Sequence, residues 1–192
     1  PSSWSQEYPK KARKAIIIAN EVLDAMPVHL CSIREEGAVL RGVCLVEGCL
    51  QMMDYPDVDK SLQKQLDVLA LRCKAPYQTE LNVNIKPWLQ GMAKHCQQAV
   101  LLIVDYGYAA AEYYHPQRSN GTLRAYKSQQ LQTDILKYPG EQDLTAHVNF
   151  TAVVEAADTL GFELLGFTSQ ADFLLQTGLF AEGNYGKAFN VQ

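Results

Sequence analysis

The chain has 192 residues and a mass of 21.4 kDa, which suits one sizeable domain or one domain with a small appendage. Hydrophobic residues make up 47% of the chain and charged residues 20%, and these ordinary values exclude a wholly disordered protein. The net charge of −4 argues against a nucleic-acid partner, and the longest apolar runs fall far short of the ~20 residues of a membrane span.

Three short apolar runs predict strands of a parallel sheet. Residues 15–19 read AIIIA, residues 99–104 read AVLLIV, and a weaker run at residues 162–167 reads FELLGF. Continuous apolar runs of this length are typical of strands that are buried on both faces of a parallel sheet.

Helical patterns lie between and after these runs. Residues 58–69 carry apolar side chains at spacings of three and four residues, which predicts an amphipathic helix. Residues 149–161 begin with an asparagine suited to an N-cap and end with a glycine, as helices often do. Residues 169–178 open with a capping box, which predicts a last short helix. Strands that alternate with helices predict the α/β fold class.

One stretch interrupts this alternation. Residues 28–33 and 39–46 flank the sequence Arg34-Glu35-Glu36-Gly37, which is typical of a hairpin turn. A hairpin and two helices exceed what a crossover between two core strands requires. We therefore expect residues 28–98 to form an inserted cap on the substrate side, and residues 1–27 and 99–192 to form the α/β domain.

The five cysteines predict neither a zinc site nor a disulfide framework, because they are odd in number and no CxxC pair occurs. Buried free thiols in a reducing compartment are the expected state. No signal peptide is visible, so we expect a bacterial cytoplasmic location, or the mitochondrial matrix if the protein is eukaryotic. Because the chain begins with Pro1, we also expect it to be processed or to be a piece of something longer.

Polar side chains follow the first predicted core strand. Asn20, Glu21 and Asp24 come directly after AIIIA, and ligands of open α/β sheets bind beyond the carboxyl ends of the strands. On a helical turn Glu21 and Asp24 would share a face, where two carboxylates could hold a cation, a metal or a guanidinium group. In the alternative interpretation, Asn20 caps a following helix and the two acids favour its N-terminus.

Two further segments carry polar side chains. Asp105 and Tyr106 come directly after AVLLIV, where an acid could belong to a site. The alternative, which spacing alone slightly favours, is a simple strand end. The loop at residues 112–126 is dense in hydrogen-bonding groups and aromatic rings. Such a loop over an α/β sheet is often functional, and His115 could act as a base and Arg118 as a carboxylate anchor. The alternative is a surface loop held by its own hydrogen bonds.

The segment that follows and the missing motifs narrow the chemistry. Asp143, Thr145 and His147 alternate, so one face of an extended segment would carry all three. The sequence has no GxSxG, GxGxxG, GxxxxGK[ST] or HExxH motif. It therefore indicates neither a hydrolase triad nor a nucleotide-binding loop, and no metal site is predicted.

Four blocks together resemble a known family. The sequences IIIANEVLDAMPV, LLIVDYGY, EYYHPQRSNGTLRAY and YPGEQDLTAHVNFT are similar, in this order, to the MidA-like family of class I S-adenosylmethionine-dependent methyltransferases. Its mitochondrial members are known as complex I assembly factors that methylate an arginine on a subunit of that complex. The closing GFTSQADFLLQTGL resembles the tail of the family.

This resemblance implies a fold, and the sequence departs from the family's pattern in two ways. AIIIA and AVLLIV would be the fourth and fifth strands of a class I, Rossmann-like sheet, and the chain would be the C-terminal half of the family's fold. The glycine-rich loop that grips the methyl donor belongs to the N-terminal half, which this sequence does not contain. The segment after RAY usually carries histidine in the family, whereas residues 127–130 read KSQQ.

The resemblance also implies roles for single residues. The residues after the fourth strand lie beside the methyl donor and the acceptor, which makes Glu21 and Asp24 the catalytic candidates. Asn20 is the candidate for binding the cofactor, S-adenosyl-L-methionine. Carboxylates could orient an arginine guanidinium and localise its charge, so that one nitrogen is free to attack. The expected substrate-binding residues are Asp105, Tyr106, Tyr113, His115, Arg118 and Asp143.

Three interpretations of function remain at this stage. The first is half of a protein arginine methyltransferase, with a protein substrate that could be a complex I subunit. The second is a non-catalytic assembly or interaction factor that uses a methyltransferase fold for binding, and the third is a small-molecule methyltransferase. An isolated half would present an unprotected sheet edge. We therefore expect it to associate with the missing N-terminal half or to form a homo-oligomer.

Overall fold

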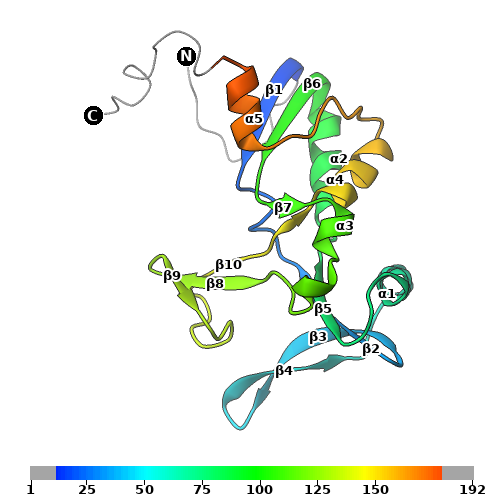
Figure 1. Cartoon of the computed structure of the whole chain (residues 1–192), viewed down its shortest axis with the longest axis vertical. Helices are drawn as coiled ribbons and strands as arrows, with labels where there is room; N and C mark the ends of the chain where they lie inside the picture. Colours follow the sequence, from blue (N-terminus) through cyan, green and yellow to red (C-terminus); the bar gives the residue numbers. More distant parts are fainter. Residues whose placement is uncertain (1–11, 179–192) are drawn as a thin grey trace.

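The central element is a pair of parallel strands, β1 (Ala12–Asn20) and β6 (Cys96–Val104). The computed structural model describes residues 12–178 of the chain (Figure 1). The register aligns Ala15 with Ala99 and Asn20 with Val104, so the two strands end at the same level. This pairing confirms the two stronger strand predictions and places the segments that follow the strands side by side.

One face of the β1–β6 pair packs against a buried cluster, while the other face is exposed. The cluster consists of Leu23, Ile85, Leu89, Val148 and Val153. Leu101 and Ile103 of β6 pack against it. On the other face, Ile16 is 78% exposed, Ile18 67% and Val100 48%. The expected burial on both faces is therefore wrong for residues 12–178, in which β1 and β6 form a sheet of two strands.

The helices are α1 (Lys60–Arg72), α2 (Ile85–His95), α3 (Ala110–Tyr113), α4 (Phe150–Asp158) and α5 (Gln170–Gln176). Leu62, Leu66 and Leu69 form the buried stripe of α1. The side chain of Asn149 caps α4 and that of Ser169 caps α5, each by accepting a hydrogen bond from a backbone N–H of the first turn. All three helices predicted from the sequence are confirmed.

The weaker apolar run at residues 162–167 does not form a strand. It pairs with no other strand of the described residues, and Leu164 and Leu165 are exposed. Phe167 instead places its ring against Phe150, with the ring centroids 5.3 Å apart. A strand needs a neighbour for its backbone hydrogen bonds. The third strand prediction is therefore wrong within residues 12–178.

A separate antiparallel sheet has the strand order β4-β3-β2-β5. Its strands are β2 (His29–Arg34), β3 (Gly37–Val46), β4 (Cys49–Tyr55) and β5 (Tyr77–Leu81). The predicted hairpin is confirmed, because β2 and β3 pair on either side of the turn at Glu35 and Glu36. The leucine stripe of α1 covers one face of this sheet by packing against Cys31 and Leu40.

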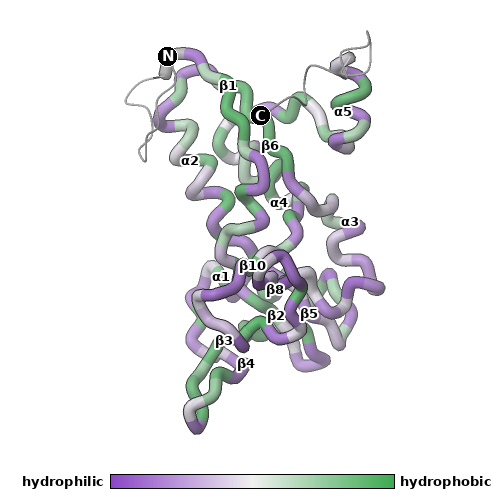
Figure 2. Tube along the Cα trace, turned by 90° about the vertical axis from the view of Figure 1, so that its left-hand side faces the viewer, coloured by the Kyte–Doolittle hydropathy of each residue, from purple (hydrophilic) through white to green (hydrophobic). Residues whose placement is uncertain are grey.

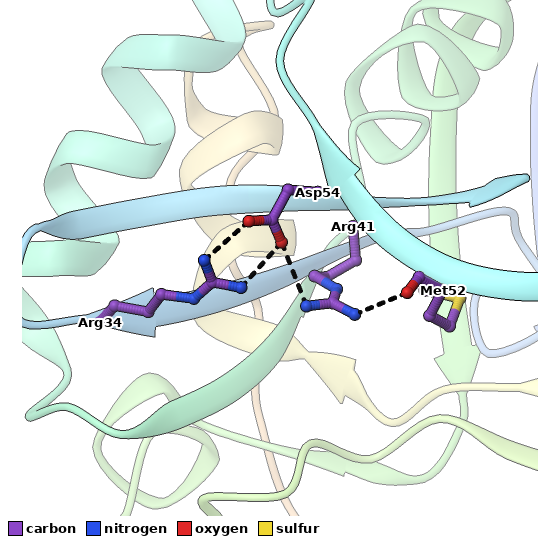
Figure 3. A network of polar contacts seen from close by, with 4 residues as sticks. All are labelled: Arg34, Arg41, Met52 and Asp54. Carbon is purple, nitrogen blue, oxygen red and sulfur yellow. Dashed lines mark hydrogen bonds and ion pairs between the residues drawn. The ribbon is translucent and has the colours of Figure 1, made fainter.

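Three charged side chains link β2, β3 and β4 on this sheet (Figure 3). Asp54 accepts a hydrogen bond of 2.7 Å from each terminal nitrogen of Arg34, and one of 3.1 Å from Nη1 of Arg41. Nη2 of Arg41 donates to the carbonyl oxygen of Met52 at 3.0 Å. The hydrogen bonds from Arg34 lower the pKa of the Asp54 carboxyl. Exposed ion pairs contribute little stability, but this group ties three neighbouring strands together.

The chain between β6 and α4 forms short elements. β7 (Gly107–Tyr108) pairs in parallel with β11 (Val148–Asn149). β8 (Arg124–Lys127) pairs with both β9 (Gln130–Gln132) and β10 (Asp143–Thr145). Figure 1 shows this second small sheet on the left of the molecule, above the β3–β4 hairpin. No helix of the described residues is long and apolar enough to cross a membrane.

All five cysteines are free thiols. Cys31 and Cys73 are buried, and burial raises the pKa of Cys31 to about 12 and that of Cys73 to about 11. Cys49 is exposed, because it begins the edge strand of the antiparallel sheet. The expectation of buried thiols is confirmed for the first two cysteines and is wrong for Cys49.

Candidate functional site

The segment that follows β1 is a turn rather than a helix. Asn20 is exposed at the end of β1, opposite Val104. Glu21 is exposed and has a φ of 49°, and its N–H donates to the carbonyl oxygen of Val104 at 2.9 Å. Asp24 is buried. The alternative in which Asn20 caps a helix is therefore wrong, and no helical face is shared by the two acids.

Asp105, directly after β6, organises this turn. Its Oδ2 accepts hydrogen bonds from the backbone N–H of Leu23 at 2.9 Å and of Asp24 at 3.4 Å. Its Oδ1 accepts one from the N–H of Tyr106 at 2.9 Å. The pKa of the Asp105 carboxyl is raised, chiefly by burial and further by the charge of Asp24, although these three N–H groups act in the opposite direction. Asp105 is thus more than a strand end, because it fixes the position of the neighbouring acid.

Asp24 is the most enclosed of the predicted site residues on this turn. Only 4% of it is exposed, and its Oδ2 accepts a short hydrogen bond from the hydroxyl of Tyr106. Its Oδ1 is buried and has no hydrogen-bond partner among the described residues. Burial and the bond to Asp24 raise the pKa of Tyr106 to about 12, so the tyrosine remains a donor at neutral pH. Asp24, Asp105 and Tyr106 are therefore brought together as one group.

This acidic group has no cationic partner in the described part of the chain. The ion pairs of residues 12–178 join Arg34 and Arg41 to Asp54, and Lys127 to Glu141. Two neighbouring carboxylates, one of them with a free oxygen, attract a cation strongly in a partly buried site. The arrangement is suited to a cationic ligand. The described residues contain no cluster of His, Cys, Asp and Glu that could hold a metal ion.

A second polar group is centred on Glu80 of β5, a residue that the sequence did not single out. Glu80 is 5% exposed. It accepts hydrogen bonds from the N–H and the hydroxyl of Thr122 at 2.8 and 2.9 Å, from the N–H of Leu123 at 2.9 Å, and from the hydroxyl of Tyr113 at 3.2 Å. No sequence signal marks Glu80, since a charged residue in a short strand is usually exposed. This group attaches the 112–126 loop to the antiparallel sheet.

The other predicted loop residues have structural contacts. Tyr113 belongs to the Glu80 group. Nδ1 of His115 accepts a hydrogen bond of 3.3 Å from the N–H of Gln117 and caps a short 3₁₀ helix. The guanidinium of Arg118 lies 3.7 Å from the ring centroid of Tyr108, and its Nε donates to the carbonyl oxygen of Glu112. These contacts explain the fold of the loop and leave the substrate-binding roles as predictions.

Asp143 and His147 do not form one continuous face. Asp143 is exposed on β10, where it lies opposite Tyr126. His147 lies beyond the end of β10, between the rings of Tyr106 and Tyr108 at centroid distances of 5.6 and 5.4 Å. Its backbone N–H donates to the hydroxyl of Thr122, and its Nδ1 is buried with no hydrogen-bond partner in the described part of the chain. Burial, and then two nearby arginines, lower the pKa of this imidazole, so that it is neutral at neutral pH.

His147 should therefore make the stability of the protein depend on pH. Because its pKa is lower in the folded state, the unfolded chain binds the proton first, and stability falls as the pH drops below the ordinary value of about 6.5. We expect the urea midpoint to fall between about pH 7.5 and about pH 5.5, and to fall less in a His147→Gln variant. His29→Gln, at an exposed histidine, is the control. An equal fall in all three proteins would contradict the prediction.

A cleft of about 390 Å³ lies beside the acidic group. The antiparallel sheet provides one wall through Leu30, Arg41, Val43 and Met52. The second small sheet and its loop provide the other wall, through Leu123, Ile135, Leu136 and Leu144. Asp24 and the turn that follows it also line the cleft. The cleft therefore combines largely apolar walls with one buried carboxylate and with Arg41, whose guanidinium is paired with Asp54. This combination suits a ligand with an apolar stem and a cationic head.

The sequence matches a family model, and the fold matches several solved structures. Residues 1–168 match the family described as "putative S-adenosyl-L-methionine-dependent methyltransferase". Two of these solved structures are crystal structures from Burkholderia thailandensis, one of an uncharacterized superfamily protein and one of a superfamily member and likely methyl transferase bound to S-adenosyl-homocysteine. Each matches with a TM-score of 0.84 and 34% sequence identity, over 93% of this chain. The chain covers 47% and 46% of those two chains, about half of their length. No curated protein matches the chain.

Proposed function

The chain belongs to this family of S-adenosyl-L-methionine-dependent methyltransferases, and from that premise we propose that it forms part of an enzyme that methylates arginine in a protein. The observation that carries the proposal is the buried carboxylate of Asp24, which has a free Oδ1 and no cationic partner within residues 12–178. It lies just beyond the carboxyl ends of two parallel strands, where ligands of α/β sheets bind.

The residues present fit a positively charged methyl donor. When bound, S-adenosylmethionine supplies a methyl group on a sulfonium centre to an attacking nucleophile. Asp24 and Asp105 carry two carboxylates near this edge that form no ion pair within residues 12–178, which favours a cation by charge. Asn20 and Glu21 are exposed at the end of β1 and are the side chains proposed to contact the donor and the acceptor there.

The same group would position a guanidinium acceptor. Oδ1 of Asp24 can accept a hydrogen bond from an N–H of the guanidinium, while the hydroxyl of Tyr106 continues to donate to Oδ2. This charge-assisted hydrogen bond draws the positive charge toward one nitrogen of the guanidinium. It also orients another guanidinium nitrogen for attack on the methyl group. Glu21 would supply a second carboxylate. The apolar walls of the cleft suit the aliphatic stem of an arginine side chain.

The identity of the acceptor is proposed from the resemblance of the four sequence blocks. The MidA-like members of mitochondria methylate a subunit of respiratory complex I, so a subunit of that complex is the proposed substrate, and assembly of the complex is the proposed context. The remaining part of the enzyme, with a glycine-rich loop for the donor, is proposed to come from the N-terminal half that this sequence does not contain.

The first test is calorimetric titration of S-adenosylhomocysteine into this chain and into the longest native form of the protein. We expect binding to the long form, and weak or no binding to this chain. Binding to this chain alone would contradict the split of the donor site. A failure to bind to either form would overturn the enzyme proposal in favour of a non-catalytic assembly factor.

The second test concerns Asp24 and uses the long form with arginine peptides and with small amines as acceptors. Asp24→Asn is expected to lower kcat/KM for the arginine peptide about 100-fold, because it removes a charge that acts on the reacting group. Asp57→Asn, at an exposed loop residue, should leave it unchanged. Equal activity of Asp24→Asn and the parent would contradict the proposed role, and turnover of small amines alone would indicate a small-molecule methyltransferase.

A further inference from the structure

One face of the β3–β4 hairpin carries an apolar strip formed by Val43, Leu45, Leu50 and Met52. The register places Val43 opposite Met52 and Leu45 opposite Leu50, and residues two apart on a strand lie on the same face. Val43 is 54% exposed, Leu45 70% and Leu50 37%. Figure 2 shows the hairpin projecting from the lower end of the molecule with much of its length hydrophobic.

This strip faces away from the core of its own sheet. The leucines of α1 pack against Cys31 and Leu40, which lie opposite each other in the register. Because side chains alternate between faces along a strand, the residues of the strip lie on the other face, together with Arg41. The strip therefore lies on the face of the sheet that α1 does not cover.

The strip continues directly into the cleft beside Asp24. Val43 and Met52 line the cleft, as does Arg41. Leu45 and Leu50 are each two residues farther along the same strands, which extends the apolar surface by roughly 7 Å toward the tip of the hairpin. One continuous surface thus leads from Asp24, which forms no ion pair with another described residue, to exposed aliphatic side chains. A ligand that fills the cleft and extends toward the tip of the hairpin would lie along this surface.

The base of the hairpin is held in place before any ligand binds. Asp54 of β4 binds Arg34 of β2 and Arg41 of β3, and Arg41 also donates to the carbonyl oxygen of Met52 (Figure 3). These contacts cross three strands at the inner end of the strip. A surface that is already ordered loses less conformational entropy on binding.

We propose that the strip is the docking surface for the acceptor polypeptide, which places a cationic side chain in the cleft toward Asp24 and lays its apolar neighbours on Val43, Leu45, Leu50 and Met52. The proposal rests on the function proposed above and adds where the polypeptide binds. Charge complementarity argues for this occupant. The cleft is lined by one carboxylate, Asp24, which forms no ion pair within residues 12–178, and by Arg41, whose guanidinium is already paired with Asp54. The strip itself carries no charge, so a segment with one cationic residue among aliphatic ones matches both parts.

The test compares two acceptor peptides on the long native form of the protein. The first is a peptide of about 15 residues with one arginine flanked by leucines and valines, long enough at ~3.3 Å per residue to reach the tip of the hairpin. The second is a peptide of about three residues around the same arginine, which cannot reach it. The double variant Leu45→Ser/Leu50→Ser removes the strip, and Leu71→Ser, at a leucine of α1 that is 90% exposed, is the matched control.

We expect the double variant to raise the KM and the Kd for the long peptide about tenfold or more, since two aliphatic contacts are lost. Its kcat, its turnover of the short peptide and its affinity for S-adenosylhomocysteine should stay unchanged, and the control should behave like the parent. Affinity for the donor product and fluorescence anisotropy of the labelled long peptide give readouts that do not depend on turnover.

The other outcomes overturn the proposal in distinguishable ways. Equal values for the double variant and the parent on the long peptide would mean that the acceptor binds elsewhere. A parent that is dimeric in light scattering and a monomeric double variant would show an interface between copies of the chain. Loss of donor-product binding in the double variant would indicate a structural role of the strip. If the parent methylates neither peptide and binds no donor product, the proposed function fails as well.

Discussion

Replacing Gly107 with alanine is expected to destabilise the protein severely and to displace the acidic group. Gly107 pairs with Val148 where β7 meets β11. A Cβ at this position would overlap the carbonyl oxygen of Val148 and lie 2.7 Å from its carbonyl carbon and its nitrogen. All three are backbone atoms, so no side chain can rotate away. Overpacking costs about 1–3 kcal/mol and occasionally more, and a backbone collision belongs at the upper end of that range.

The effect should extend from stability to ligand binding. Tyr106 precedes Gly107, and its carbonyl oxygen accepts a hydrogen bond of 3.0 Å from the N–H of Val148. Moving β7 would therefore shift the tyrosine that holds Asp24. Urea denaturation, and titration of the long native form with S-adenosylhomocysteine, measure the two effects. Gly166→Ala is the control, since a Cβ there meets no atom within 4 Å. A Gly107→Ala protein with the parent's midpoint would contradict the structure at this contact.

Replacing Glu80 with alanine is expected to have the second large effect. The substitution leaves the N–H of Thr122, the N–H of Leu123 and the hydroxyl of Tyr113 without their acceptor. A buried donor that loses its partner costs about 1–3 kcal/mol, and bonds to charged groups lie toward the upper end. We expect the free energy of unfolding to fall by about 3 kcal/mol or more.

Two further variants make the Glu80 prediction specific. Glu80→Gln should recover only part of the loss, because its amide offers one acceptor oxygen and turns an NH₂ group toward neighbouring donors. Glu155→Ala, at an exposed glutamate of α4, should change the free energy of unfolding by less than about 0.5 kcal/mol. Equal urea midpoints for Glu80→Ala and Glu155→Ala would show that the four hydrogen bonds do not hold the loop.

Local features of the fold followed from the sequence because they depend on local physics. The helices of residues 60–72 and 150–158 are set by apolar spacing and by caps such as Asn149. Both begin and end within a few residues of the ranges predicted from the sequence. The prediction of a strand at residues 162–167 was wrong for a different reason. A strand requires a partner, and apolar content alone does not state whether one is available.

The site was partly predictable for the same reason. Asp105 could be placed because it directly follows a strong strand pattern, and Asp24 because it follows another strand that ends at the same edge. Glu80 could not be found, since its burial depends on Thr122, which lies far along the chain and reaches it only in the folded protein. The turn after β1 also differs from the helical turn considered for Glu21 and Asp24, because Glu21 adopts a positive φ, which sequence spacing does not reveal.

The long separation between β1 and β6 has a consequence for how the protein folds. Residues 21–95 must be closed into a loop before the two parallel strands can pair, and the entropic cost of closure rises with loop length. The β2, β3 and β4 strands are consecutive in the chain and joined by short turns, so their pairing is local and faster. We therefore expect the hairpin to form while Asp24 and Asp105 are still apart, and the acidic group to assemble late in folding.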